Sequence, residues 1–113
     1  MDERARNAES SATLMALRVA PEVEAELDGI WSYVATESGD AEVADRLINS
    51  ITDRFFMLSR HPYLGRRRDY DLRPGLRSLP VAGYVIIHRI EERDVIILHV
   101  FHGRRDLKTL LNQ

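Results

Sequence analysis

The spacing of hydrophobic residues changes along the chain, and each spacing predicts a different element of structure. A short apolar run over residues 14–20 stops at Pro21 and predicts a first strand. The residues before this run are small and polar and have no period. We therefore expect a flexible extension over residues 1–13 and a single domain over residues 14–113.

Two stretches after the first strand place hydrophobic residues on one stripe of a helix. In residues 23–34 they recur at helical spacing, and Pro21 suits the first turn, which needs no N–H at that position. In residues 43–58 the stripe recurs, with Asp40 placed to cap the helix and Pro62 placed to end it. Together they predict an antiparallel helical hairpin with one apolar face.

Polar and apolar residues alternate in the last part of the chain, which predicts strands. Gly83 separates the first two of these strands, and residues 91–94 form a hairpin turn between the last two. Residues 61–75 hold prolines, glycines and arginines and are expected to form a charged loop. Leucines at helical spacing predict a short final helix over residues 103–113. The predicted strands cover residues 76–81, 84–90 and 95–102.

The fold class that follows is α+β, in the order β-α-α-β-β-β with a short C-terminal helix. Short turns make consecutive strands antiparallel, so we expect a small antiparallel β-sheet with the N-terminal helical hairpin packed on one face. Both faces of the last strand are apolar, but the helical hairpin can cover only one. We therefore expect the other face to be covered by the final helix, by a second copy of the chain or by another protein. We expect Val95, Ile97 and Phe101 on one face and Ile96, Leu98 and Val100 on the other.

Composition limits the class of protein. The chain has 113 residues, of which 44% are hydrophobic and 30% charged, as expected for one globular domain. It has no cysteine, which excludes disulfides, thiolate nucleophiles and cysteine-ligated metals and is compatible with a cytoplasmic location. The N-terminus lacks the apolar segment of a secretory signal, and no apolar run approaches the roughly 18 residues of a membrane span.

Charge is divided unevenly along the chain. Residues 1–59 hold 12 acidic and 5 basic side chains, a net charge of −7, whereas residues 60–113 hold 6 acidic and 11 basic side chains, a net charge of +5. All the basic residues except Lys108 are arginine. A basic half suits phosphates, RNA or an acidic partner protein, although a genome rich in G and C also favours arginine.

Polar residues within the predicted strands are the candidates for chemistry. Metal-independent cleavage of RNA needs a base, an acid and cations on the phosphate, which histidine and arginine supply. A histidine in an apolar strand is more often structural, and this reading is stronger for His88 and His99 than for His102, which ends its strand. The candidate catalytic set is Arg77, His99, His102 and Arg104.

Other features have structural explanations beside the functional ones. The run of arginines at 66–68, with Tyr63 and Tyr70 around it, suits single-stranded RNA, but a solvated or partner-facing run explains it better. Trp31 falls on the helical stripe and is expected in the core. The histidines have no metal-ligand spacing and there is no phosphate-binding loop, so we predict neither a metal nor a cofactor.

Three segments carry a family resemblance, which extends over residues 14 to about 110. In this order they resemble the RelE/ParE superfamily of toxins from bacterial type II toxin–antitoxin systems, and most closely the ParE branch. The start at Ala20-Pro21 and the loop with His61-Pro62 and Gly65-Arg66 also match the branch. The three segments are PGLRSLP (74–80), YVIIHRI (84–90) and VIILHVFHGRRD (95–106).

The resemblance implies the α+β fold derived above and a hetero-oligomeric complex with a cognate antitoxin, ParD-like and of the ribbon-helix-helix type. RelE-like members cleave mRNA on the ribosome, whereas ParE-like members poison DNA gyrase and are not known as nucleases. This chain departs from the RelE-like pattern, because Lys108 is its only lysine and no tyrosine follows Tyr84. The departures favour the ParE branch.

Three hypotheses stay open. The first is a ParE-like toxin that causes growth arrest by contacting DNA gyrase, is neutralised by its antitoxin and is not itself catalytic. The second is a RelE-like, ribosome-dependent mRNA endonuclease with His102 or His99 as acid or base, so direct binding of nucleic acid stays open. The third is a non-toxic member that only binds the antitoxin. The expected binding residues are Arg66, Arg67, Arg68, Arg77, His102, Arg104 and Arg105.

Overall fold

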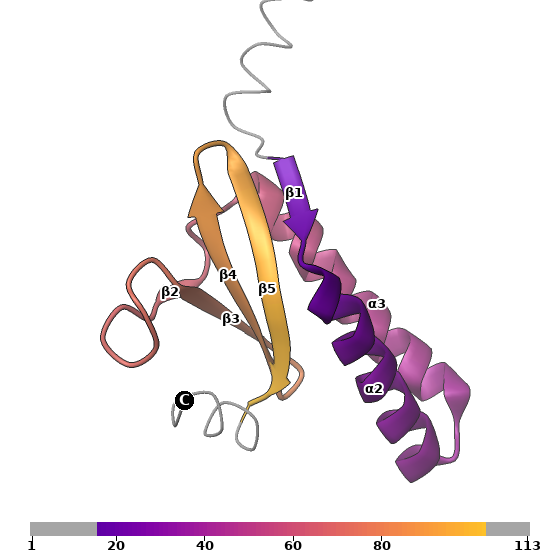
Figure 1. Cartoon of the computed structure of the whole chain (residues 1–113). Helices are drawn as coiled ribbons and strands as arrows, with labels where there is room; N and C mark the ends of the chain where they lie inside the picture. Colours follow the sequence, from indigo (N-terminus) through magenta and orange to yellow (C-terminus); the bar gives the residue numbers. More distant parts are fainter. Residues whose placement is uncertain (1–15, 104–113) are drawn as a thin grey trace, which may run out of the picture.

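The computed structural model describes residues 16–103 (Figure 1). The expected extension over residues 1–13 lies outside the described residues, and so does nearly all of the expected C-terminal helix. The elements are β1 (Ala16–Val19), α2 (Pro21–Ser38), α3 (Ala41–Arg60), β2 (Arg66–Arg67), β3 (Arg77–Val81), β4 (Tyr84–Glu91) and β5 (Asp94–His102).

Both helices begin and end where the sequence predicts. Pro21 occupies the first turn of α2, and Gly39 ends that helix in the left-handed conformation, with a φ of 69°. The Asp40 side chain caps α3 by accepting a hydrogen bond from the Glu42 N–H at 2.9 Å. α3 ends at Arg60, before the first proline that follows. Neither helix of the described part is long and apolar enough to span a membrane.

The sheet has five strands in the order β1-β5-β4-β3-β2. As expected, β3, β4 and β5 form an antiparallel meander. Its two turns are two-residue loops in which Ala82, Gly83 and Glu92 have φ values of 50°, 86° and 54°. Positive φ is what such tight hairpin turns require, because it matches the twist of the strands that they join.

The edges of the sheet differ from the expectation of a purely antiparallel sheet. β1 runs parallel to β5, with Leu17 opposite Val95, so the sheet is mixed. β2 is a strand of two residues inside the segment expected to be a loop, and it pairs antiparallel with β3. Two residues are too few to show an alternating pattern, and the pairing of β1 joins segments far apart in the sequence.

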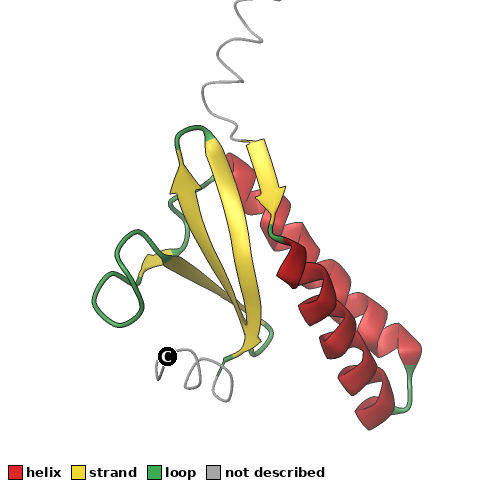
Figure 2. Cartoon of the chain, in the orientation of Figure 1, coloured by secondary structure: helices red, strands yellow, loops and turns green. Residues whose placement is uncertain are grey.

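The helical hairpin covers one face of the sheet, as predicted (Figure 2). In this view α2 runs beside β5, and α3 lies behind β1 and α2. The core between the layers contains Val23, Ile51 and Leu58 of the helices and Ile86 and Ile97 of the strands, all fully buried. Burying a side chain of this size contributes about 1.5–3 kcal/mol, so this contact holds the two layers together.

Trp31 does not belong to this core, contrary to the sequence-based expectation, because 37% of its surface is exposed. Its indole Nε1 donates a hydrogen bond to the Asp45 carboxylate at 2.8 Å. The position of Trp31 on the helical stripe directs its side chain toward α3. There it connects α2 to α3 through Asp45 and does not fill the core beneath the sheet.

A β-bulge changes the faces of β5. The register with β4 shifts at Leu98, which is the extra residue. Val100 therefore shares a face with Val95 and Ile97 and joins the core, 2% exposed. Phe101 lies on the opposite face. The expectations for Val100 and Phe101 were wrong because alternation along a sequence does not reveal an inserted residue.

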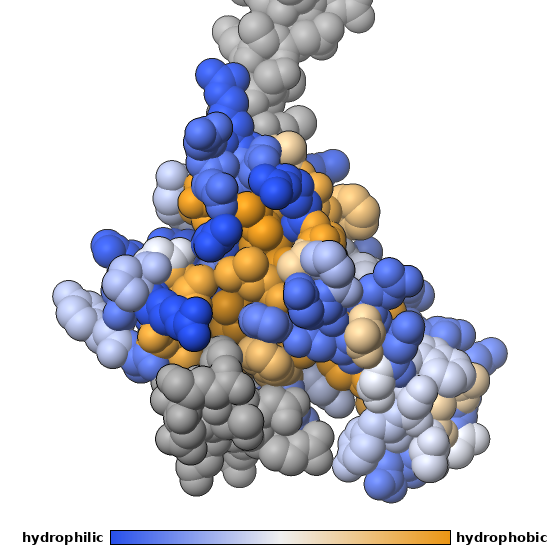
Figure 3. Space-filling model, viewed as in Figure 1, coloured by the Kyte–Doolittle hydropathy of each residue, from blue (hydrophilic) through white to orange (hydrophobic). Residues whose placement is uncertain are grey.

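The helix-free face of the sheet carries apolar side chains, as predicted. Figure 3 shows apolar residues gathered over β4 and β5 and bordered by polar ones. Ile87 and Ile96 on this face are buried, whereas Val85 and Phe101 are half-buried. Part of the face is therefore covered and part is accessible.

Candidate functional site

Three basic side chains lie in one row across neighbouring strands. Arg67 of β2 is directly opposite Arg77 of β3, and Arg77 is directly opposite His88 of β4. Residues opposite each other in an antiparallel pair share a face of the sheet, with Cβ atoms about 4.5–5.5 Å apart. Sequence reasoning selected Arg67 and Arg77 as binding residues, and the structure brings these two together.

Arg77 is held by the segment that connects α3 to β2. Its Nη2 donates to the carbonyl oxygens of Gly65 at 2.6 Å and Tyr63 at 3.1 Å, and its guanidinium lies 5.4 Å from the centre of the Tyr63 ring. Its Nε is buried and has no hydrogen-bond partner among residues 16–103. Arg77 therefore fixes the connection after α3, and the connection in turn gives its guanidinium a defined position.

His88 is fully buried beside Arg77, and neither of its ring nitrogens has a hydrogen-bond partner in the described part of the chain. Burial, and after it the positive charge of Arg77, lowers the pKa of His88 to about 4. Gly65 packs on the ring, since a Cβ added there would lie 2.5 Å from His88 Nε2. His88 is thus a neutral side chain near pH 7, in keeping with the structural reading.

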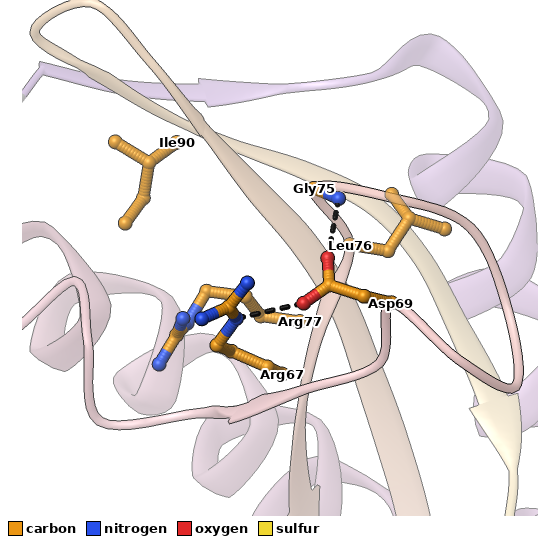
Figure 4. A pocket seen from close by; sticks show the side chains of 6 residues that line it. All are labelled: Arg67, Asp69, Gly75, Leu76, Arg77 and Ile90. Carbon is orange, nitrogen blue, oxygen red and sulfur yellow. Dashed lines mark hydrogen bonds and ion pairs between the residues drawn. The ribbon is translucent and has the colours of Figure 1, made fainter.

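Arg67 and Arg77 line a cleft of about 240 Å³ (Figure 4). Asp69 is the carboxylate of this cleft, and it accepts hydrogen bonds from the Gly75 N–H at 2.8 Å and from Arg67 Nε at 2.7 Å. The bond from Gly75 first, and then Arg67, hold the pKa of Asp69 below its usual value, so this carboxylate stays ionised. The lining residues are Arg67, Asp69, Gly75, Leu76, Arg77 and Ile90.

The other two arginines of the 66–68 run have different surroundings. The Nε of Arg68 donates to both carboxylate oxygens of Asp71 at 2.9 Å, and its Nη1 donates to the Ser78 hydroxyl at 3.0 Å. The hydrogen bond with Asp71 raises the pKa of Arg68, and the same bond lowers the pKa of Asp71. Arg66 is opposite Ser78, on the face away from the cleft, and is exposed. The run is therefore three separate environments and not one basic patch.

His99 lies at the edge of the sheet beside α2. Its Nδ1 is 2.8 Å from Glu26 Oε2, and the other oxygen of this carboxylate accepts a hydrogen bond from the Val100 N–H at 2.9 Å. The ring also stacks on Phe101, with centroids 4.8 Å apart. His99 thus joins α2 to an otherwise open stretch of β5, which is a structural task.

His102 lies near the end of β5. Its ring meets Tyr84 edge to face, with centroids 5.5 Å apart, and it lines a hollow of about 400 Å³ with Pro80 and Val85 among others. His102 is opposite Tyr84, a core residue, and so faces the helix-covered side of the sheet. Arg104 and Arg105 lie outside the described residues, so their placement beside His102 stays a prediction.

The candidate catalytic residues within residues 16–103 do not converge. His99 and His102 face opposite sides of the sheet. Arg77 is opposite His88, whereas His102 is opposite Tyr84, four residues away on β4 and roughly 13 Å at the usual rise of a strand. No group of three or more metal-ligating side chains occurs in the described part of the chain.

Sequence reasoning missed the acidic and glycine residues that shape these sites. Asp69 follows Arg67 by two residues, and Asp71 follows Arg68 by three. This short spacing in the sequence could have indicated that the aspartates neutralise the arginines. Glu26 pairs with His99 across a sequence separation of 73 residues, and Gly65 meets the His88 ring. No local pattern announces either of these contacts.

Comparison with known families and curated proteins gives a consistent result. The family model described as the ParE toxin of type II toxin–antitoxin systems, parDE, matches residues 17–107. The chain is similar to Toxin ParE3 of Caulobacter vibrioides, with 37% identity over 97 residues, which cover 86% of this chain and 94% of that protein. It is also similar to Toxin ParE1 of the same organism, with 31% identity over 75% of this chain and 85% of the relative.

Solved structures share the fold. A chain of the chromosomal ParDE toxin–antitoxin system from P. aeruginosa superposes with a TM-score of 0.69, at 22% identity over 80% of this chain and 97% of that one. A chain of the toxin–antitoxin complex RelBE2 from Mycobacterium tuberculosis gives a TM-score of 0.58, at 22% identity over 79% of this chain and 98% of its own length. At these identities the likeness concerns the fold, which is the α+β fold expected from the sequence.

Proposed function

The chain belongs to the ParE toxin family of type II toxin–antitoxin systems, and from this premise we propose that it arrests growth by binding DNA gyrase in the cytoplasm. A cognate antitoxin, ParD-like and of the ribbon-helix-helix type, neutralises it in a hetero-oligomeric complex. The related solved structures come from toxin–antitoxin systems, which supports a partner of this kind.

The observation that carries the proposal is the separation of the candidate acid, base and cation that lie within residues 16–103. His99 is occupied by Glu26, and His102 faces the other side of the sheet from His99. Arg77 is opposite His88, roughly 13 Å along β4 from the residue opposite His102. General acid–base chemistry requires such groups within hydrogen-bond reach of one reacting phosphate. An activity that resides in a binding surface needs no such convergence.

The surface proposed for binding includes the exposed arginines of β2 and the cleft that Arg67 shares with Arg77. Arg68 supports this surface through Asp71 and Ser78. His102, Arg104 and Arg105 remain proposed binding residues near the end of β5.

The gyrase proposal is tested by adding the full chain, made by cell-free synthesis, to DNA gyrase, ATP and relaxed plasmid. We expect supercoiling to stop or cleaved plasmid to accumulate, while relaxation by topoisomerase I continues unchanged. Normal supercoiling at micromolar protein would contradict the gyrase target. Co-expression with the product of the neighbouring reading frame should restore growth, and the two proteins should purify together.

One observation favours the second candidate, a ribosome-dependent mRNA endonuclease. His102 lines a hollow of about 400 Å³ near the end of β5, the kind of place where an acid or base meets a substrate. Primer extension on cellular mRNA after expression distinguishes the two functions. Codon-phased cuts that disappear with His102→Ala would support the endonuclease and contradict the gyrase proposal. Intact mRNA together with DNA-damage signalling would support the gyrase proposal.

A further inference from the structure

The guanidinium groups of Arg67 and Arg77 have unused donors that line one cleft. Within residues 16–103, Arg67 donates only through Nε, to Asp69, and Arg77 donates only through Nη2, to two backbone carbonyls. Nη1 and Nη2 of Arg67 and Nη1 of Arg77 therefore have no hydrogen-bond partner in that part of the chain. The Arg67 side chain is 75% exposed, so a ligand from solution can reach it.

The charges of the cleft are not balanced. Two guanidinium groups stand directly opposite each other on β2 and β3, an arrangement that is destabilising for like charges. Asp69 is the carboxylate among the lining residues, and its two oxygens are already engaged by Gly75 and Arg67. A second anion would offset the remaining positive charge and use the donors that have no partner.

The walls of the cleft add a preference for a particular kind of anion. Leu76 and Ile90 add apolar surface to the lining; in Figure 4 Ile90 lies on the side of the two arginines and Leu76 beside Gly75 and Asp69. The volume of about 240 Å³ has room for one carboxylate side chain and part of its neighbour. Arginine binds a carboxylate through two parallel hydrogen bonds, which suits a planar acid.

We propose that this cleft binds the carboxylate of an aspartate or glutamate in a peptide segment of a protein partner, with an adjacent apolar residue of that segment against Leu76 and Ile90. The proposal specifies the chemical class of the ligand and does not depend on gyrase being the target. A failure of the gyrase assay would therefore leave it standing, and its own failure would leave the gyrase proposal standing.

The surroundings favour a single carboxylate over a nucleic acid. A phosphate backbone is bound by a series of cations that follow its repeating charges. Two of the nearby cations are instead neutralised within the chain, Arg68 by Asp71 and Arg89 by Glu91 at 2.8 Å, and Arg66 lies on the face away from the cleft. Among the residues that line the cleft, two arginines face one aspartate, so a single anionic group balances the remaining charge.

The test uses the ¹⁵N-labelled full chain, made by cell-free synthesis, and two capped tripeptide probes, acetyl-Leu-Glu-Leu-amide and acetyl-Leu-Gln-Leu-amide. We expect the Glu probe to shift the Gly75 amide and the Arg67 Nε signal in a saturable way, and the Gln probe to bind at least about tenfold more weakly, because it lacks the charge. Equal binding of both probes, or no saturable shift with either, would overturn the proposal.

Arg67→Gln and Arg66→Gln form a matched pair, since both remove one charge from β2 but only Arg67 faces the cleft. We expect Arg67→Gln to weaken the Glu probe about tenfold and Arg66→Gln by less than about twofold. Equal losses in both variants would reduce the effect to general electrostatics and refute the site. A thymidine oligonucleotide of about twelve residues that binds more tightly than the Glu probe, with the same dependence on Arg67, would assign the cleft to nucleic acid.

Discussion

Two regions of the sheet use the same residue types in opposite ways. At the arginine end, defined by Gly65, Arg67, Arg77 and His88, three basic side chains stand in a row. At the histidine edge, defined by Glu26, His99 and Val100, a carboxylate joins the ring and a backbone N–H. The histidine edge satisfies its polar groups with a carboxylate from another element. The arginine end keeps His88 neutral and leaves arginine donors without a partner among the described residues.

The comparison teaches that the partner of a basic side chain, and not its identity, decides what it can do. Arg68 and Arg67 are neighbours in the sequence, yet Arg68 is closed by Asp71 and Ser78 while Arg67 keeps two terminal nitrogens that face a cleft. His88 and His99 both lie in strands, but only His99 meets a carboxylate. Binding is therefore expected at the arginine end, and stabilisation at the histidine edge.

The largest effect expected concerns pH at the arginine end. The pKa of His88 is about 4 in the folded chain and ordinarily 6.5, so the unfolded chain takes up a proton that the folded chain refuses between these values. Stability is fully present above pH 6.5 and falls by roughly 3 kcal/mol as the pH drops toward 4. Urea unfolding at a series of pH values measures this.

His88→Leu removes the titrating group and serves as the control for the pH effect. We expect its stability to change little between pH 6.5 and 4.5. If the wild-type chain and this variant lost the same stability in that interval, the buried neutral histidine would not be the cause.

Gly65→Ala should break the arginine end by packing alone. The added Cβ would lie 2.5 Å from His88 Nε2 and 2.9 Å from the Ser78 carbonyl oxygen, and a backbone atom has little room to move. We expect a loss of about 2–3 kcal/mol in the free energy of unfolding. Gly29→Ala is the matched control, because nothing lies within 4 Å of that position in α2 and alanine should stabilise the helix by up to about 1 kcal/mol.

Glu26→Ala should weaken the histidine edge. It leaves the Val100 N–H without its acceptor, and we expect a loss of about 1–2 kcal/mol together with faster hydrogen exchange at that amide. Glu24→Ala, an exposed residue two positions earlier on α2, should change neither measurement. An unchanged exchange rate in the Glu26 variant would show that the carboxylate does not hold the edge.

The smallest effect expected separates the two neighbouring arginines by thermal unfolding. Arg68→Gln should lower the midpoint, because its side chain is 11% exposed and bonds to both Asp71 and Ser78. Arg67→Gln should leave the midpoint within error, because its side chain is 75% exposed. A lower midpoint for Arg67→Gln alone would mean that Arg67 stabilises the fold. It would contradict the distinction between Arg68, which is engaged within the chain, and Arg67, which is available to a ligand.

Much of the fold could be predicted because its signals are local. Pro21, Gly39 and Asp40 set the helix ends through backbone geometry and capping, and the alternating pattern set β3, β4 and β5. The ParE resemblance was likewise contained in consecutive segments, and the match over residues 17–107 confirms it. Trp31 shows the limit, since a stripe defines a direction on a helix but not what lies in that direction.

The candidate site was predicted only in part. Arg67 and Arg77 were chosen as separate binding residues, and their common cleft depends on the β2–β3 register, which two residues of β2 do not reveal. The bulge at Leu98 reversed the faces of Val100 and Phe101 relative to Val95 and Ile97, which alternation along the sequence does not reveal. Each of these is a contact between segments that lie apart in the chain.

The sequence alone determined the α+β class, the helical hairpin and the antiparallel meander, because spacing, capping and turn residues act between near neighbours. It also carried the ParE family resemblance, which lies in consecutive segments. Only the tertiary structure decided that β1 pairs in parallel with β5, that His88 is buried against Gly65, and that Arg67 and Arg77 keep donors toward one cleft. The physical reason is that burial, pKa and the pairing of charges depend on which distant atoms surround a group, and those atoms are chosen by the packing of the whole chain.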